Sequence, residues 1–80
     1  MSSILLNRIT LNPEIGHGKP TIRNTRYLVE SMLEYLAGGD DIDTLLKEFK
    51  DLQREDILAC IAYANEVMKL KGLSPTVASA

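Results

Sequence analysis

The segment from Arg54 to Lys71 constrains the fold most, because apolar side chains cover most of the circumference of the helix that it is expected to form. They are Ile57, Leu58, Ala59, Cys60, Ile61, Ala62, Tyr63, Ala64, Val67, Met68 and Leu70. A helix that is apolar nearly all round is either central to its own fold or part of a subunit interface. One small domain cannot cover such a helix completely, so we expect it to be both and the chain to form a homodimer.

The length of the chain allows one small domain. Eighty residues, with a mass of 8.9 kDa, exclude a two-domain enzyme. With 45% hydrophobic and 25% charged residues, the composition is typical of a packed, ordinary fold. We expect a single domain over residues 1–72, followed by a frayed, uncharged tail over residues 73–80.

The sequence indicates a cytoplasmic protein. Cys60 is the only cysteine, so the chain cannot form an internal disulfide. Its apolar runs are shorter than the roughly 18 residues that a membrane helix needs, and residues 1–11 lack the pattern of a signal peptide. We therefore expect neither export nor a membrane partner.

Charge is distributed unevenly along the chain. The net charge is −2 and the pI about 5.2, which argues against the broad basic face of most nucleic-acid binders. Residues 1–27 hold four basic and one acidic side chain, a balance of +3, whereas residues 28–80 hold five basic and ten acidic ones, a balance of −5. Any contact with an anionic partner is therefore expected to involve the N-terminal third.

Two short strands are predicted in this basic N-terminal third. Residues 4–11 read as a strand because Leu5, Ile9 and Leu11 fall on one face at period two. Asn12-Pro13 ends it, and a glycine-rich loop leads to a possible second strand from Thr21 to Arg23. Because such strands are marginal alone in water, we expect them to pack on helices or to pair with another copy of the chain.

Helical periodicity begins at Leu28 and predicts three helices. The first ends at Gly38-Gly39, and Asp41 is expected to cap the second. Residues 50–52 form a turn of helix-turn-helix length, and the third helix, with acidic residues in its first turn and lysines in its last, ends before Gly72. The expected fold class is α+β, mainly α: short N-terminal strands followed by a three-helix, helix-turn-helix-like bundle, with a dimer formed through the strands and the third helix.

The segment from residue 12 to residue 26 is the densest motif, and it resembles the signature of the domain of unknown function 433 family. The matching elements are Asn12-Pro13-Glu14-Ile15, His17-Gly18-Lys19-Pro20, Ile22, Asn24-Thr25-Arg26 and Val29. Further matches are Gly39, Leu45-Leu46, Phe49, Asp51-Leu52 and Glu55-Asp56-Ile57, so the resemblance covers about residues 8–64.

The resemblance implies a helix-turn-helix protein, of a kind that includes antitoxins paired with a ribonuclease toxin and repressing their own operon. The chain departs from the family pattern at four positions: Asn12 replaces Asp, His17 and Asn24 replace Gly, and Lys50 stands where Pro is usual. Asn24 is a mild change because Asn tolerates positive φ better than other non-glycine residues. His17 suggests that the loop differs in shape or partner.

Seven cations are candidates for contacts with nucleic acid or an acidic partner: Arg8, Lys19, Arg23, Arg26, Lys47, Lys50 and Arg54. An equally good alternative for Arg23 and Arg26 is that they hold the loop against the acidic helices of the same fold, and Lys19 is interpreted as solvated. The candidate contact set is therefore defined by charge alone.

No catalytic, cofactor or metal site is predicted. His17 lies alone between two glycines, Cys60 reads as a small core residue, and the three aspartates at 40, 41 and 43 are explained by capping and solvation. The segment from Gly16 to Pro20 lacks the spacing and hydroxyl of a phosphate loop. We expect the chain not to be an enzyme.

Two functions remain, and the first is the one that we expect from the sequence and its resemblance. The first is an antitoxin-type, DNA-binding autorepressor of a toxin–antitoxin pair, with residues 45–57 as the helix-turn-helix; its partners would be operator DNA and a ribonuclease-type toxin. The carboxylates at the start of its recognition helix oppose this hypothesis, because phosphate repels them. The alternative is a dimeric protein-interaction module with the same fold that does not bind DNA.

Overall fold

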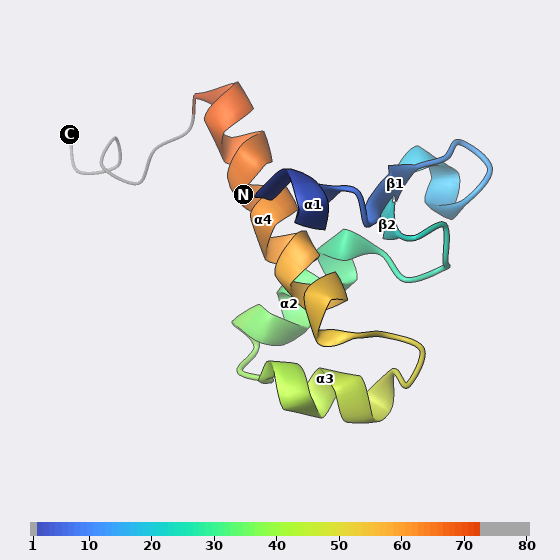
Figure 1. Ribbon diagram of the computed structural model, residues 1–80, viewed down its shortest axis with the longest axis vertical. Helices are drawn as coiled ribbons and strands as arrows, with labels where there is room; N and C mark the ends of the chain where they lie inside the picture. The colour runs from blue at the N-terminus through green and yellow to red at the C-terminus, as the bar shows by residue number, and fades with distance from the viewer. Residues whose placement is uncertain (1, 73–80) are drawn as a thin grey trace.

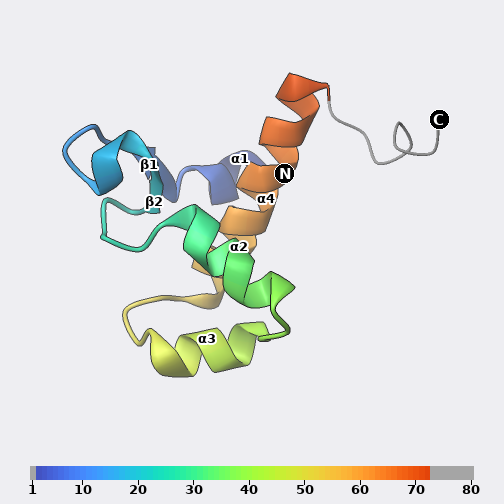
Figure 2. The same cartoon turned by 180° about the vertical axis from the view of Figure 1, so that it is seen from behind.

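The fold is built around one long helix that most of the other elements contact. The computed structural model describes residues 2–72, and the helix α4 (Arg54–Lys71) packs against α1 (Ser2–Leu6), α2 (Val29–Ala37), α3 (Ile42–Glu48) and β1 (Ile9–Leu11). Figure 1 shows α4 in orange along the long axis, with α3 across its N-terminal end and the strands to one side. Figure 2 shows the same arrangement from behind, where α2 lies against α4.

The two strands form an antiparallel pair. β1 pairs with β2 (Pro20–Ile22), and Ile9, Thr10 and Leu11 lie opposite Ile22, Thr21 and Pro20. A short 3₁₀ turn, η1 (Gly16–Gly18), lies in the connection between them. The second strand ends one residue earlier than predicted. With these two strands and the helices, the expected α+β, mainly α fold class is confirmed.

The N-terminal prediction is wrong in part. Residues 2–6 form α1 instead of the beginning of a strand, and only Ile9–Leu11 is extended. The run Ile4-Leu5-Leu6 is too short for periodicity to distinguish a strand from a helix. Packing of α1 against α4 decides between them, because tertiary contacts override weak local preference.

The ends of the other helices follow the predicted signals. The Asp41 carboxylate accepts a hydrogen bond from the Thr44 amide at 2.8 Å and caps α3, and hydrogen bonding to Thr44 lowers the pKa of Asp41. After α2, Gly39 has a positive φ of 109°, a backbone conformation that glycine adopts readily. Gly72 ends α4 in the left-handed region at φ of 71°. The expected tail, residues 73–80, lies outside the described residues.

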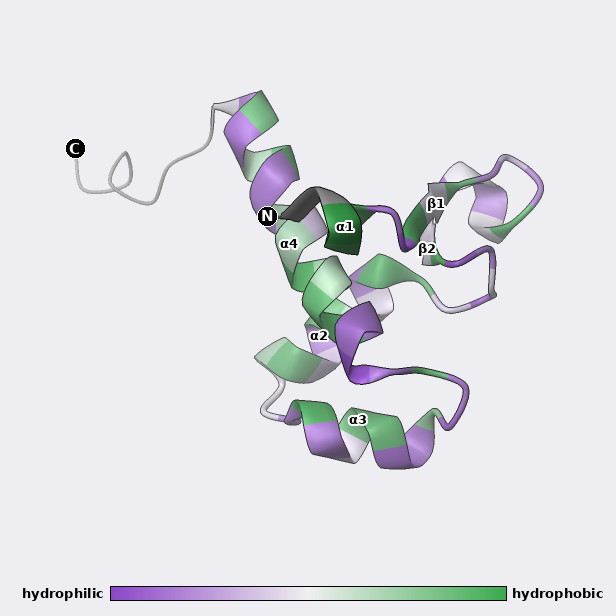
Figure 3. Cartoon of the chain, viewed as in Figure 1, coloured by the Kyte–Doolittle hydropathy of each residue, from purple (hydrophilic) through white to green (hydrophobic). Residues whose placement is uncertain are grey.

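The core lies between α2, α3, β2 and one face of α4. Its buried apolar residues are Ile22, Val29, Met32, Leu45, Leu52, Ile57 and Cys60. In Figure 3 the side of α3 toward the other helices is green and its outer side is purple, as expected for an amphipathic helix. Among the described helices, none is both long and apolar enough to cross a membrane.

Candidate interaction surface

Arg8 and Arg23 converge on one buried carboxylate. Asp56, in the first turn of α4, is fully buried. Its Oδ1 accepts hydrogen bonds from Arg8 Nη1 at 2.9 Å and Arg23 Nε at 3.0 Å, and its Oδ2 accepts from Arg23 Nη2 at 2.8 Å. The backbone amide of Gln53 also donates a hydrogen bond to Oδ2 at 2.8 Å, as in a capping box.

The electrostatics of this cluster favour the ionised carboxylate. Burial on its own raises the pKa of Asp56, but hydrogen bonds from Arg23, the Gln53 amide and Arg8 outweigh burial and hold that pKa below its ordinary value. The same hydrogen bonding raises the pKa of Arg23. The cluster is therefore a charged connection between α4 and the residues that follow α1 and β2.

The backbone around Arg23 supports the same connection. The Arg23 amide donates to the Arg8 carbonyl at 2.8 Å, and Arg23 Nη2 donates to the Asp51 carbonyl at 3.1 Å. Arg23 and Asn24, in the turn after β2, both have positive φ, of 47° and 57°. Position 24 is where the family pattern has Gly, the residue that adopts positive φ most readily. Internal contacts thus occupy the guanidinium of Arg23, as one of the two sequence-based interpretations proposed.

Lys19 and Arg26 lie on the surface of the N-terminal third. Lys19 Nζ is 3.3 Å from Glu30 Oε2, with both side chains more than half exposed, so the pair contributes little to stability. The exposed guanidinium of Arg26 lies 5.6 Å from the centre of the Tyr27 ring, a cation–π distance. The structure therefore does not bring Arg26 to the Asp56 cluster.

Lys47, Lys50 and Arg54 surround the turn between α3 and α4. All three side chains are exposed, and Arg54 Nη1 is 3.3 Å from Asp43 Oδ1. Within residues 2–72, Lys47 and Lys50 belong to no ion pair. Of the seven candidate cations, these two lysines and Arg26 thus have no carboxylate within ion-pair distance in the described part of the chain.

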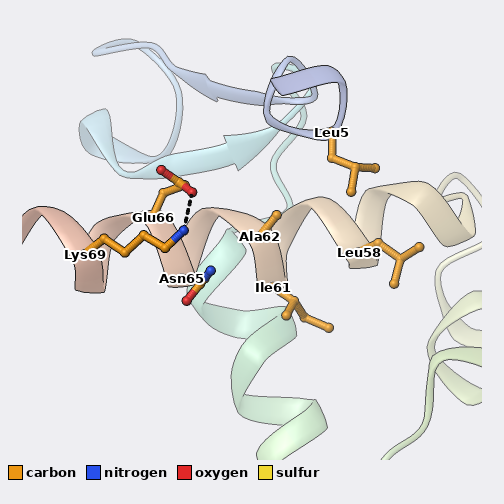
Figure 4. Close-up of a pocket in the computed structure, with 7 residues that line it drawn as sticks. All are labelled: Leu5, Leu58, Ile61, Ala62, Asn65, Glu66 and Lys69. Carbon is orange, nitrogen blue, oxygen red and sulfur yellow. Dashed lines mark hydrogen bonds and ion pairs between the residues drawn. The ribbon is translucent and has the colours of Figure 1, made fainter. Parts of the chain in front are cut away.

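The outer face of α4 is apolar and open. Leu58, Ile61 and Met68 are 37%, 45% and 40% exposed, although α4 also supplies much of the core. Figure 4 shows a groove beside this face, with Leu5 of α1 directed toward α4. The groove has a volume of about 400 Å³ and is lined by Leu5, Leu58, Ile61, Ala62, Asn65, Glu66 and Lys69.

A second groove follows the other side of α4. It has a volume of about 330 Å³ and is lined by Pro20, Val29, Glu30, Leu33, Tyr63, Ala64, Val67 and Met68. Met68 borders this second groove and also belongs to the exposed apolar face. The C-terminal half of α4 is thus flanked by apolar surface on both sides, which is typical of a helix that contacts another protein.

The remaining chemistry-bearing residues are isolated. His17 is exposed in η1 with φ of 57°, and burial raises the pKa of the Cys60 thiol to about 12. Among the described residues, no three His, Cys, Asp or Glu side chains are grouped as metal ligands.

The role of Asp56 was missed by sequence reasoning, which assigned it only to the helix dipole. Its partners are 33 and 48 residues away, so no local pattern reveals them. One signal was available: Gln53 and Asp56 have the three-residue spacing of a capping box, which points the Asp56 side chain back toward the helix start.

Comparison with known proteins gives one family. A family model described as "Protein of unknown function (DUF433)" matches residues 9–64. These residues span β1 to the middle of α4 and include the Asp56 cluster except Arg8. No curated protein and no solved structure matches the chain.

Proposed function

This chain belongs to the DUF433 family of proteins of unknown function, and from its surfaces we propose that it is a dimeric protein-interaction module with a helix-turn-helix-like fold. The observation that carries the proposal is the exposed apolar face of α4, formed by Leu58, Ile61 and Met68. Exposing such a face to water has a cost that contact with another protein removes. The proposed role is non-enzymatic and requires no cofactor.

The charge around the α3–α4 turn supports a protein partner over DNA. Residues 40–56 hold seven acidic and three basic side chains. Glu55, in the first turn of α4, is exposed where a recognition helix approaches base edges and phosphates. The guanidinium groups of Arg8 and Arg23, which would otherwise offset this repulsion, face Asp56.

Sedimentation equilibrium tests the proposal. We expect the wild-type chain to have twice the mass of one chain and Ile61→Asp to shift it toward the monomer, because a carboxylate in the buried contact is desolvated. The control is Leu11→Asp, a matched change at an apolar residue that is 64% exposed on β1, and it should leave the dimer intact. Dissociation of this variant would indicate that the strands also contact the partner chain. A monomeric wild type, or a dimer that Ile61→Asp leaves intact, contradicts the proposal.

A DNA-binding, antitoxin-type autorepressor is the second candidate, favoured by Lys47 and Lys50. These lysines are exposed beside the α3–α4 turn without a carboxylate partner among the described residues, and the backbone order of α3, turn and α4 is that of a helix-turn-helix. In this candidate a ribonuclease-type toxin occupies the apolar surface, and Arg26 and Lys19 add to the attraction for DNA.

Fluorescence anisotropy separates the two candidates. The chain is titrated against its own upstream DNA and a scrambled duplex at about 50 and about 200 mM salt, because phosphate contacts weaken steeply with salt. The interaction module predicts no preference for the upstream duplex. If binding is specific, Lys47→Glu with Lys50→Glu should abolish it. Arg26→Glu is the better probe of the N-terminal third than Arg23→Glu, which would place a second carboxylate against Asp56.

A further inference from the structure

The exposed face of α4 has the spacing of a coiled-coil seam. Leu58, Ile61, Asn65 and Met68 are separated by three, four and three residues, the order a, d, a, d of a heptad, and all four are exposed. At about 100° per residue, Leu58 and the buried Cys60 lie about 200° apart on the helix. These four residues define the seam, in which Leu58 lies opposite Cys60, whereas Met68, about 80° from Cys60 around the helix, lies at the edge of the core beside the second groove.

We propose that the seam binds a second copy of this chain with the two α4 helices antiparallel. The inference rests on the proposed function, because it identifies the partner of the α4 face and fixes its direction. In this register Leu58 packs against the partner's Met68, and Ile61 packs against the partner's Asn65. Ala62, beside the middle of the seam, faces the partner's Ala62, and its small side chain lets the helices approach closely.

Charge complementarity selects the antiparallel direction. Glu55 and Lys69 are exposed and occupy equivalent heptad positions beside the seam, near opposite ends of α4. Antiparallel pairing places Glu55 beside the partner's Lys69, and two-fold symmetry produces this pair twice. Parallel pairing leaves the two charges about 21 Å apart along the axis, since each residue rises about 1.5 Å.

The groove in Figure 4 provides space for a side chain of the partner helix. Leu5 of α1 forms one wall, and Leu58, Ile61 and Asn65 line the side toward the seam. Within one chain, Lys69 Nζ is 3.4 Å from Glu66 Oε2, but the Lys69 side chain is 65% exposed, so it remains accessible to a partner carboxylate. A knob from the partner helix thus meets an apolar hole with a charged rim.

A charge swap tests the direction. In sedimentation equilibrium at about 50 mM salt, Glu55→Lys alone and Lys69→Glu alone should each weaken the dimer about tenfold, because each creates two repulsive pairs. The double variant should restore the affinity to within about threefold of wild type. Each change alone is unfavourable to the dipole of α4, so the double variant should destabilise the helix more than either single variant. Recovery of the dimer affinity in the double variant can therefore come only from charge pairing between the two chains.

The control is Glu34→Lys, which makes the same charge change at an exposed position of α2 and should leave the dimer unchanged. Circular dichroism of each variant checks that the fold is intact. If wild type is dimeric and Ile61→Asp dissociates it, but the double variant is no tighter than the single variants, the antiparallel register is wrong while the α4 contact stands. A monomeric wild type overturns both.

Cysteine crosslinking gives a second measurement that is independent of charge. Leu58→Cys together with Met68→Cys should form a dimer linked by disulfides under mild oxidation, whereas Leu58→Cys alone should not. The two positions are about 15 Å apart within one helix, too far for a bridge inside a chain. Crosslinking by Leu58→Cys alone would indicate parallel helices and overturn the proposal. The native Cys60 is buried and does not compete.

Discussion

At the residue scale, Asp56 connects the N-terminal third to α4. A buried carboxylate is costly unless it is paired and hydrogen-bonded. Asp56 receives four hydrogen bonds, three of them from the guanidinium groups of Arg8 and Arg23. Because Arg8 follows α1 and Arg23 follows β2, a single side chain fixes the position of both segments on the first turn of α4.

Replacing Asp56 therefore tests the connection. Asp56→Asn keeps the size of the side chain but removes its charge and one acceptor, and we expect the free energy of unfolding to fall by about 2–3 kcal/mol. Urea denaturation measures the change. Asp40→Asn, the same chemical change at an exposed residue between α2 and α3, should alter stability by no more than about 0.5 kcal/mol. Equal losses for the two variants would show that the cluster adds nothing.

The lowered pKa of Asp56 also predicts a pH dependence. In the unfolded chain an aspartate has a pKa of about 3.9. The pKa of Asp56 in the folded chain is lower than that. The unfolded state thus binds the proton more readily, so the stabilisation is complete above about pH 5 and is lost as pH falls through the folded pKa. Urea denaturation from neutral to acidic pH should show the stability gap between wild type and Asp56→Asn closing below about pH 4. A gap that stays constant would refute a depressed pKa.

At the element scale, the sequence predicts α2, α3 and α4 well, because each combines helical periodicity with a local signal at its ends. Asp41 caps α3 through Thr44, and Gly72 ends α4, so both boundaries depend on neighbours within a few residues. The N-terminal segment lacks such a signal. Its three apolar residues at 4–6 fit either state, and the contact of α1 with α4, more than 45 residues away, decides.

The surroundings of the candidate contact residues could not be predicted from the sequence, for the same reason. Charge identifies Arg8 and Arg23 as cations, but only the fold shows that Asp56 faces them. The apolar circumference of α4 was readable from the sequence, whereas the division between core and exposed face depends on which sides the other elements cover. Local patterns therefore give the elements, and long-range packing determines which side chains are available to a partner.

Two glycines with similar φ allow a test of the loop before β2. Gly16 and Gly72 have φ of 63° and 71°, but a Cβ at Gly16 would lie 2.9 Å from Leu28 Cδ2 and 3.1 Å from Thr21 Cγ2, whereas nothing lies within 4 Å at Gly72. Gly72→Ala should cost about 1 kcal/mol of stability through backbone strain alone. Gly16→Ala should cost about 1–3 kcal/mol more because of overpacking. Equal costs in thermal or urea denaturation would show that the loop moves aside freely.

At the scale of the whole molecule, α4 has one covered and one exposed apolar face. One face is covered by α2, α3 and β2, and the other carries Leu58, Ile61 and Met68 on the surface. A small domain has too few elements to cover a helix on every side. If the second face is covered by a second chain, folding and association contribute to one equilibrium, and stability depends on protein concentration.

This coupling predicts a concentration-dependent melting temperature. For a dimer of 80-residue chains, a tenfold rise in concentration should raise Tm by about 4 °C, from the entropy of unfolding per residue and mass action. Ile61→Asp should remove the dependence, because its unfolding involves one chain, whereas Leu11→Asp should retain it. Calorimetry over two decades of concentration provides the measurement. If Leu11→Asp removes the dependence and Ile61→Asp does not, the strands carry the contact between chains, and the exposed face of α4 must be covered by a different partner.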